Sequence, residues 1–80
     1  MITADDYESL KSSLKVVSGL GVLDPLGSKL LAVGSGHLNF LKYALNDLGR
    51  LSAEEQYQLQ DLIYNFRDIV MEYLDERQAC

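Results

Sequence analysis

The sequence has few of the residues that cross-link very small proteins. Cys80 is its only cysteine, His37 is its only histidine, and it has no tryptophan. One cysteine cannot form an intrachain disulfide, and one cysteine with one histidine falls short of the four ligands of a structural zinc site. We therefore expect no disulfide, metal or cofactor, and we expect Cys80 to be a free thiol without a function.

Long apolar runs and a targeting pattern are also missing. No stretch approaches the roughly 18 apolar residues of a membrane span, and residues 1–6 lack the basic start and apolar run of a signal peptide. We expect a cytoplasmic protein with no membrane partner.

Basic residues are scarce in the second part of the chain. Residues 1–52 carry five acids and five bases, whereas residues 53–80 carry seven acids against Arg67 and Arg77, and the net charge is −5. This distribution disfavours nucleic acid as a partner and favours a basic surface on another protein.

Proline is also rare, and helix-start signals recur along the chain. Thr3 and Asp6 have the spacing of a capping box, and Ser52 with Glu55 forms a second one. Asp24 precedes Pro25, the only proline, as an N-cap precedes a first-turn proline. These signals predict one domain spanning residues 1–80, an all-α small helical bundle in which a short helix precedes a long antiparallel hairpin, with helices at 4–18, 25–49 and 53–77.

The predicted 25–49 helix contains glycines that leave its continuity open. Gly34 and Gly36 could end a helix, but the apolar spacing continues through them, which favours one unbroken helix. Gly27 and Gly34 are seven apart on the apolar side, where a missing side chain lets another helix approach; the alternative is that both are loop glycines. The apolar side of this helix comprises Leu26, Leu30, Leu31, Val33, Leu38, Leu41, Ala44, Leu45 and Leu48.

The predicted 53–77 helix has a wide apolar side. Helix-packing residues with alternating spacings of three and four are Leu59, Leu62, Phe66, Ile69 and Tyr73, and they are flanked by Ile63, Val70 and Leu74. Because one short helix cannot cover both long ones, we expect a homodimer that buries the surplus in a larger bundle.

A second pattern lies on the same helix, opposite this core stripe. Tyr57, Tyr64 and Met71 recur every seven residues, and aspartates recur at the same interval beside them, namely Asp61, Asp68 and Asp75. Amphipathic anchors beside a charged rim are typical of interfaces. We interpret this ridge as a partner-binding surface, with a dimer contact and plain surface as the alternatives.

Motifs for catalysis are missing. The sequence contains no phosphate-binding glycine loop, nucleophile motif or zincin signature. His37 has no ligand at a metal-binding offset on its own helix, so we expect it at the boundary of the core or in a helix contact. The protein is predicted not to be an enzyme.

Three functions fit these features. The first hypothesis is a non-enzymatic, protein-binding regulator, namely an inhibitor, anti-activator or adaptor, that occupies a basic or apolar site on a larger protein. The second is a secretion-type chaperone that shields an amphipathic client segment. The third is an acidic immunity or antitoxin protein that blocks a basic site.

Overall fold

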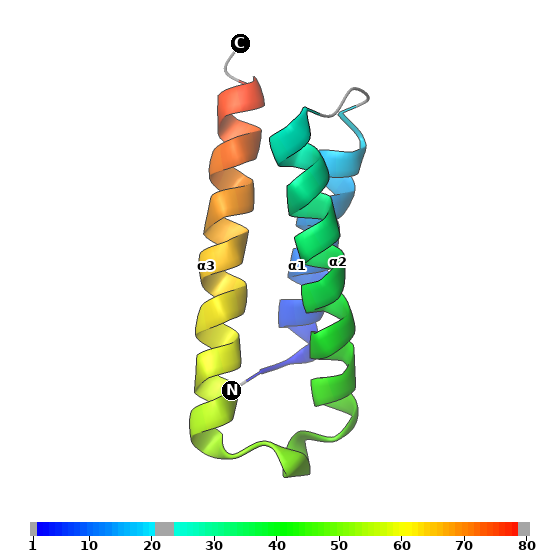
Figure 1. Cartoon of the computed structure of the whole chain (residues 1–80). Coiled ribbons are helices and arrows are strands. Elements are labelled where there is room, and N and C mark those ends of the chain that lie inside the picture. Colours follow the sequence, from blue (N-terminus) through cyan, green and yellow to red (C-terminus); the bar gives the residue numbers. More distant parts are fainter. Residues whose placement is uncertain (1, 21–23, 79–80) are drawn as a thin grey trace.

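In the computed structural model, which describes residues 2–20 and 24–78, the chain forms three α-helices and one short 3-10 helix (Figure 1). The elements are α1 (Ala4–Ser18), α2 (Pro25–Asn46), η1 (Leu48–Arg50) and α3 (Ala53–Gln78). The prediction of an all-α bundle is confirmed. Helix α2 runs without a break through Gly34 and Gly36, so the continuous-helix interpretation was correct.

The first helix begins where its capping residues predict. The Thr3 amide donates to the Asp6 carboxylate at 2.9 Å, and the Asp6 amide donates to the Thr3 hydroxyl at 3.4 Å. These bonds satisfy amides that have no partner within the helix. At the other end, the Gly19 amide donates to the Lys15 and Val16 carbonyls at 3.1 Å and closes α1.

The two long helices also begin at their predicted caps. The Gly27 amide donates to the Asp24 carboxylate at 2.8 Å, and Pro25, which follows Asp24, occupies the first turn of α2. Before α3, the Ser52 amide donates to Glu55 at 2.9 Å and the Glu55 amide donates to the Ser52 hydroxyl at 3.1 Å. Local sequence therefore sets where each α-helix starts.

Helix α2 ends at Asn46, before the predicted end at residue 49. Asp47 leaves the helical conformation with φ −148° and ψ 65°, and its carboxylate pairs with Arg50 at 2.8 Å. Aspartate is a poor helix former, so it readily leaves the helical conformation at this position. The chain then turns through η1 and enters α3 in the opposite direction (Figure 1).

Helix α1 lies behind α2 and α3 in Figure 1 and packs against both of them in an elongated bundle of 44 × 19 × 17 Å. Gly34 permits close contact with α1, because a Cβ there would lie 2.5 Å from Leu14 Cδ1. Gly27 permits close contact with α3, because a Cβ there would overlap the Tyr73 hydroxyl. Both glycines thus lie at helix contacts.

The core lies between the three α-helices. Its buried residues come from all three helices and include Leu10, Val17, Leu41, Ile63 and Val70.

Of the five predicted helix-packing residues of α3, Leu59, Phe66 and Tyr73 are buried within the chain, as are the flanking residues Ile63, Val70 and Leu74. Leu62 and Ile69 are about half exposed. The reason is that α1 docks on the Leu74 side of α3 and turns Leu62 and Ile69 away from the core.

The same difference is found on α2. Leu26 and Val33 belong to its predicted apolar side, and both are about half exposed. Leu30, Leu41 and Ala44 are the buried apolar side chains of this helix.

Candidate functional site

The predicted ridge of Tyr57, Tyr64 and Met71 is exposed but lies next to α1. The three side chains are between 41% and 64% exposed. The Tyr64 hydroxyl donates to the Asp6 carboxylate of α1 at 3.1 Å. Met71 shares a shallow hollow with Val16 of α1. The ridge was expected opposite the core stripe, and the contacts with α1 correct that placement.

Polar contacts hold the centre of this ridge in place. The Arg67 guanidinium lies over the Tyr64 ring, 5.6 Å from its centroid, and donates to the Ser9 hydroxyl at 2.7 Å. The Gln60 amide donates to the Tyr64 hydroxyl at 3.3 Å. Tyr64 is therefore oriented before any partner arrives, which lowers the entropic cost of using it as an anchor.

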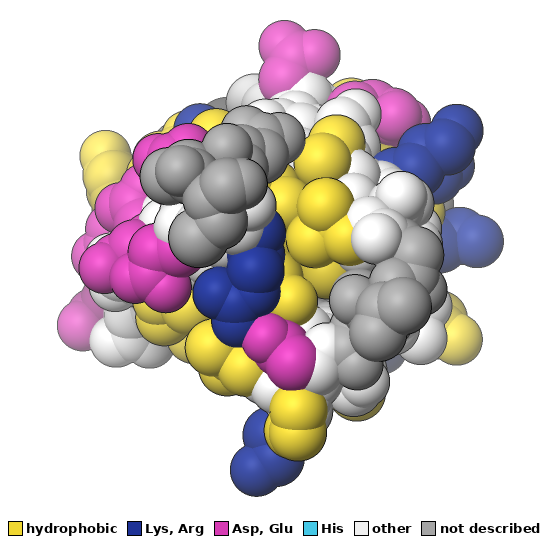
Figure 2. All heavy atoms as spheres, turned by 90° about the horizontal axis from the view of Figure 1, so that it is seen from above, with side chains coloured by type: hydrophobic (Ala, Val, Ile, Leu, Met, Phe, Trp, Pro, Cys, Tyr) yellow, Lys and Arg dark blue, Asp and Glu magenta, His cyan; other side chains and the backbone are white. Residues whose placement is uncertain are grey.

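The aspartates of the ridge remain at the surface. Asp61, Asp68 and Asp75 are all exposed. Figure 2 looks down on the end of the bundle where α3 finishes, and acidic side chains gather over the α3 side of that view. The acidic edge predicted for the ridge is thus available to solvent.

A second surface lies on the side of α2 and α3 that faces away from α1, and we call it the α2–α3 face. The sequence predicted surplus apolar surface on the long helices but not its position. Its apolar side chains are between 48% and 56% exposed, and they are Leu26, Val33 and Phe40 of α2 with Leu62 and Ile69 of α3. Within each helix they are seven residues apart, and this periodicity was the signal available in the sequence.

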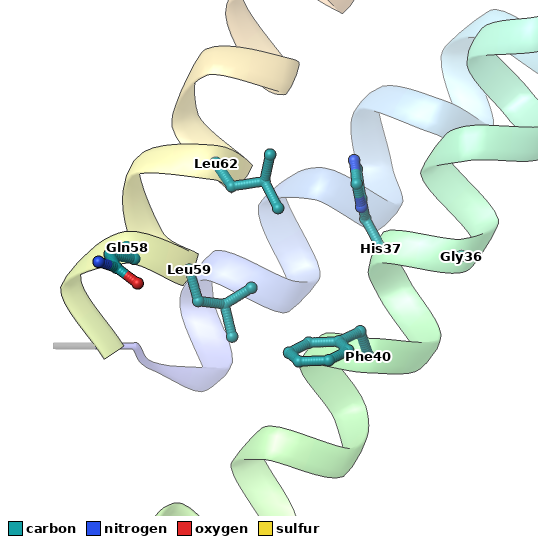
Figure 3. A pocket seen from close by; sticks show the side chains of 6 residues that line it. All are labelled: Gly36, His37, Phe40, Gln58, Leu59 and Leu62. Atoms are coloured by element: carbon teal, nitrogen blue, oxygen red, sulfur yellow. The ribbon is translucent and has the colours of Figure 1, made fainter. Parts of the chain in front are cut away.

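The α2–α3 face contains a pocket of about 380 Å³ at Phe40 and Leu62 (Figure 3). Phe40 and His37 extend from α2 toward Leu59 and Leu62 of α3, and Gly36 leaves the α2 side open. The lining is mainly apolar, so the pocket suits an apolar side chain better than a charged ligand.

His37 lies at the boundary of the core. Its ring meets the Phe66 ring edge-on, with centroids 4.9 Å apart and an interplanar angle of 82°. This is one of the two roles expected for it, and it places the imidazole at the floor of the pocket.

A polar cluster joins α3 to the start of α2. The Tyr73 hydroxyl donates to the Asp24 carboxylate at 3.1 Å, and the Arg77 guanidinium pairs with the same carboxylate. Two hydrogen bonds lower the pKa of Asp24 below its ordinary value. The bond from the Gly27 amide has the larger effect, and the bond from Arg77 has the next largest. The cap of α2 therefore also fixes the end of α3.

Metal-binding clusters and membrane-spanning helices were also searched for in the part of the chain that the structure covers. Within residues 2–20 and 24–78, no three His, Cys, Asp or Glu side chains are grouped so that they could hold a metal ion. None of the helices in these ranges is both long and apolar enough for a bilayer crossing. The expectation for Cys80 lies outside the described residues.

Comparison with protein-family models, with curated proteins and with solved structures finds no match to this chain.

Proposed function

We propose that the protein is a non-enzymatic regulator, namely an inhibitor, anti-activator or adaptor, that acts as a homodimer and binds another protein through the acidic ridge of α3. The observation that carries this proposal is the exposed line of Tyr57, Tyr64 and Met71 beside three exposed aspartates. Large amphipathic side chains with a charged rim are enriched at protein interfaces.

The charge of the ridge indicates the kind of partner. Helix α3 holds seven of the acidic residues of the chain, and only Arg67 and Arg77 offset them. Arg67 is directed to Ser9 and Arg77 to Asp24, so both bases are engaged within the bundle. The partner is therefore a protein with a site that combines basic and apolar side chains.

The test is to place a photo-crosslinking residue at position 57 and, as a matched control, at position 39 of α2, which is exposed on another side of the molecule. Crosslinking in the native host from position 57, abolished when Tyr64→Ser and Met71→Ser are added, supports the proposal. A partner captured equally well by both positions, or unaffected by the added substitutions, contradicts it.

Salt dependence separates two kinds of partner. A complex held by the aspartates weakens as ionic strength rises, because dissolved ions screen the attraction between exposed charges. The screening length is about 10 Å at 0.1 M salt and shortens as salt is added. An immunity or antitoxin function, in which acidic groups block a basic site, requires the steepest dependence. A complex that is insensitive to salt argues against that function.

The α2–α3 face favours a second candidate function. An open apolar face with a pocket at Phe40 and Leu62 suits an amphipathic segment of a client, which a secretion-type chaperone shields. Co-expression distinguishes the two functions. A client that is insoluble without this protein supports the chaperone, whereas a partner that is soluble and active without it supports the regulator.

A further inference from the structure

The α2–α3 face is apolar along both helices. Five large side chains on it are each about half exposed, and two of them, Phe40 and Leu62, line a pocket that no element of the described chain covers. Small monomeric proteins seldom expose a contiguous apolar patch of this kind without a use for it.

We propose that a second copy of the chain covers the α2–α3 face about a two-fold axis parallel to the helices, with Phe40 of each copy packed over Leu62 of the other. This inference rests on the homodimer in the proposed function and names the surface that forms it.

The size of the face fits a dimer. Helix α2 has 22 residues, which gives about 33 Å at 1.5 Å per residue. The bundle is 19 Å across. The footprint is roughly 600 Å², of the same order as the ~800 Å² that each partner buries in a stable interface.

The positions of Phe40 and Leu62 suit a two-fold contact. Both side chains line the same pocket from opposite helices, so they lie within the height of one pocket (Figure 3). A two-fold axis parallel to the helices exchanges the two sides of the face and preserves height. Phe40 of one copy then lies over Leu62 and at the mouth of the pocket of the other, where Gly36 leaves room.

The charges at the edges of the face favour the same axis. Lys29 follows Leu26 by three residues on the α2 edge, and Glu72 follows Ile69 by three residues on the α3 edge. Both are exposed and lie toward the end of the bundle where α2 begins and α3 finishes. The proposed axis brings Lys29 of each copy to Glu72 of the other.

An axis perpendicular to the helices is disfavoured by charge. It places the α3 helices of the two copies side by side, and each carries a large excess of acidic residues. Repulsion between like charges opposes that arrangement.

The test is a charge exchange at the proposed contact. Phe40→Glu and Leu62→Lys each place a charge in the interface, and we expect each variant alone to dimerise about 30-fold or more weakly than the parent. In an equimolar mixture, the introduced glutamate of one chain meets the introduced lysine of the other, and the second contact keeps its natural residues. The mixture should regain a dimer.

Sedimentation velocity measures assembly, and circular dichroism checks that each variant stays helical, as expected for substitutions at half-exposed positions. Val16→Glu is the matched control, because Val16 is 48% exposed like Leu62 but lies on α1, away from the α2–α3 face. This control should dimerise like the parent.

Each other outcome overturns the inference in a distinct way. If both charged variants dimerise as tightly as the parent, another surface forms the dimer, and the homodimer of the proposed function stands. If the charged variants are monomers whose mixture does not associate, the pairing of Phe40 with Leu62 is wrong. If the parent is a monomer at high concentration, the homodimer fails as well, while crosslinking from the ridge still tests partner binding.

Discussion

The two sides of α3 differ in what covers them. The side toward α1 is closed by apolar packing and by contacts such as those of Tyr64 with Asp6 and of Arg67 with Ser9. The side that carries Leu62 and Ile69 is equally apolar but remains open. Helix α1 has only 15 residues and lies on one side of the hairpin. The position of the shortest α-helix, α1, therefore decides which apolar side of α3 becomes core and which stays exposed.

The largest expected effect comes from two neighbouring residues of α3. Ile63 is 1% exposed and Leu62 is 48% exposed. We expect Ile63→Ala to lower the free energy of unfolding by about 2–5 kcal/mol, because it leaves a cavity in the core. Leu62→Ala should lower it by less than about 1 kcal/mol in the monomer.

Urea unfolding followed by circular dichroism at low protein concentration measures both changes, since association contributes little there. Similar losses for the two variants would show that the two sides of α3 do not differ as the structure describes.

A smaller effect is expected from two glycines of α2 that lie on opposite sides of that helix. A Cβ at Gly34 would press on the buried Leu14 of α1, whereas a Cβ at Gly36 would meet nothing within 4 Å. Gly34→Ala should destabilise by about 1–3 kcal/mol through overpacking. Gly36→Ala should stabilise by about 0.5–1 kcal/mol, because alanine is the better helix former.

The melting temperatures of the two alanine variants, compared with that of the parent, show whether each substitution destabilises or stabilises the protein. If both substitutions raise the melting temperature, α1 does not pack against Gly34 as closely as described.

The smallest effect concerns the end of the bundle, where Asp24 joins both long helices. Its pKa is lowered by the Gly27 amide and by Arg77. Its folded pKa therefore lies below the unfolded value of about 4. The stabilisation is present above that value and is lost as the pH falls through the folded pKa.

Asp24→Asn keeps a good helix cap but removes this titration. The melting temperature of the variant should fall less than that of the parent between neutral pH and pH 2.5. Glu55, whose pKa is lowered by the Ser52 amide, titrates in both proteins and serves as the internal reference. Identical acid dependence in the two proteins would mean that the Asp24 contacts do not form in solution.

The helix starts could be predicted from the sequence because the signals are local. The caps at Thr3, Asp24 and Ser52 each act over three residues, and all of them form. The end of α2 was predicted less accurately, because Asp47 can either continue a helix or turn the chain.

The choice between the two apolar sides of α3 could not be made from local patterns. Leu62 and Ile63 are both apolar, and only the docking of α1 determines which one is buried. The contact of Tyr64 with Asp6 joins residues 58 positions apart and has no local signal either. The seven-residue spacing of the ridge was visible in the sequence, but its place beside α1 was not.

The most direct test of the central claim, that the side of the hairpin left open by α1 is where the protein associates, is the melting temperature as a function of protein concentration. Because a dimer is stabilised by mass action, the melting temperature of the parent should rise with concentration, and that of Leu62→Lys should not. A parent melting temperature that is independent of concentration, or a rise that persists unchanged in Leu62→Lys, would contradict the claim.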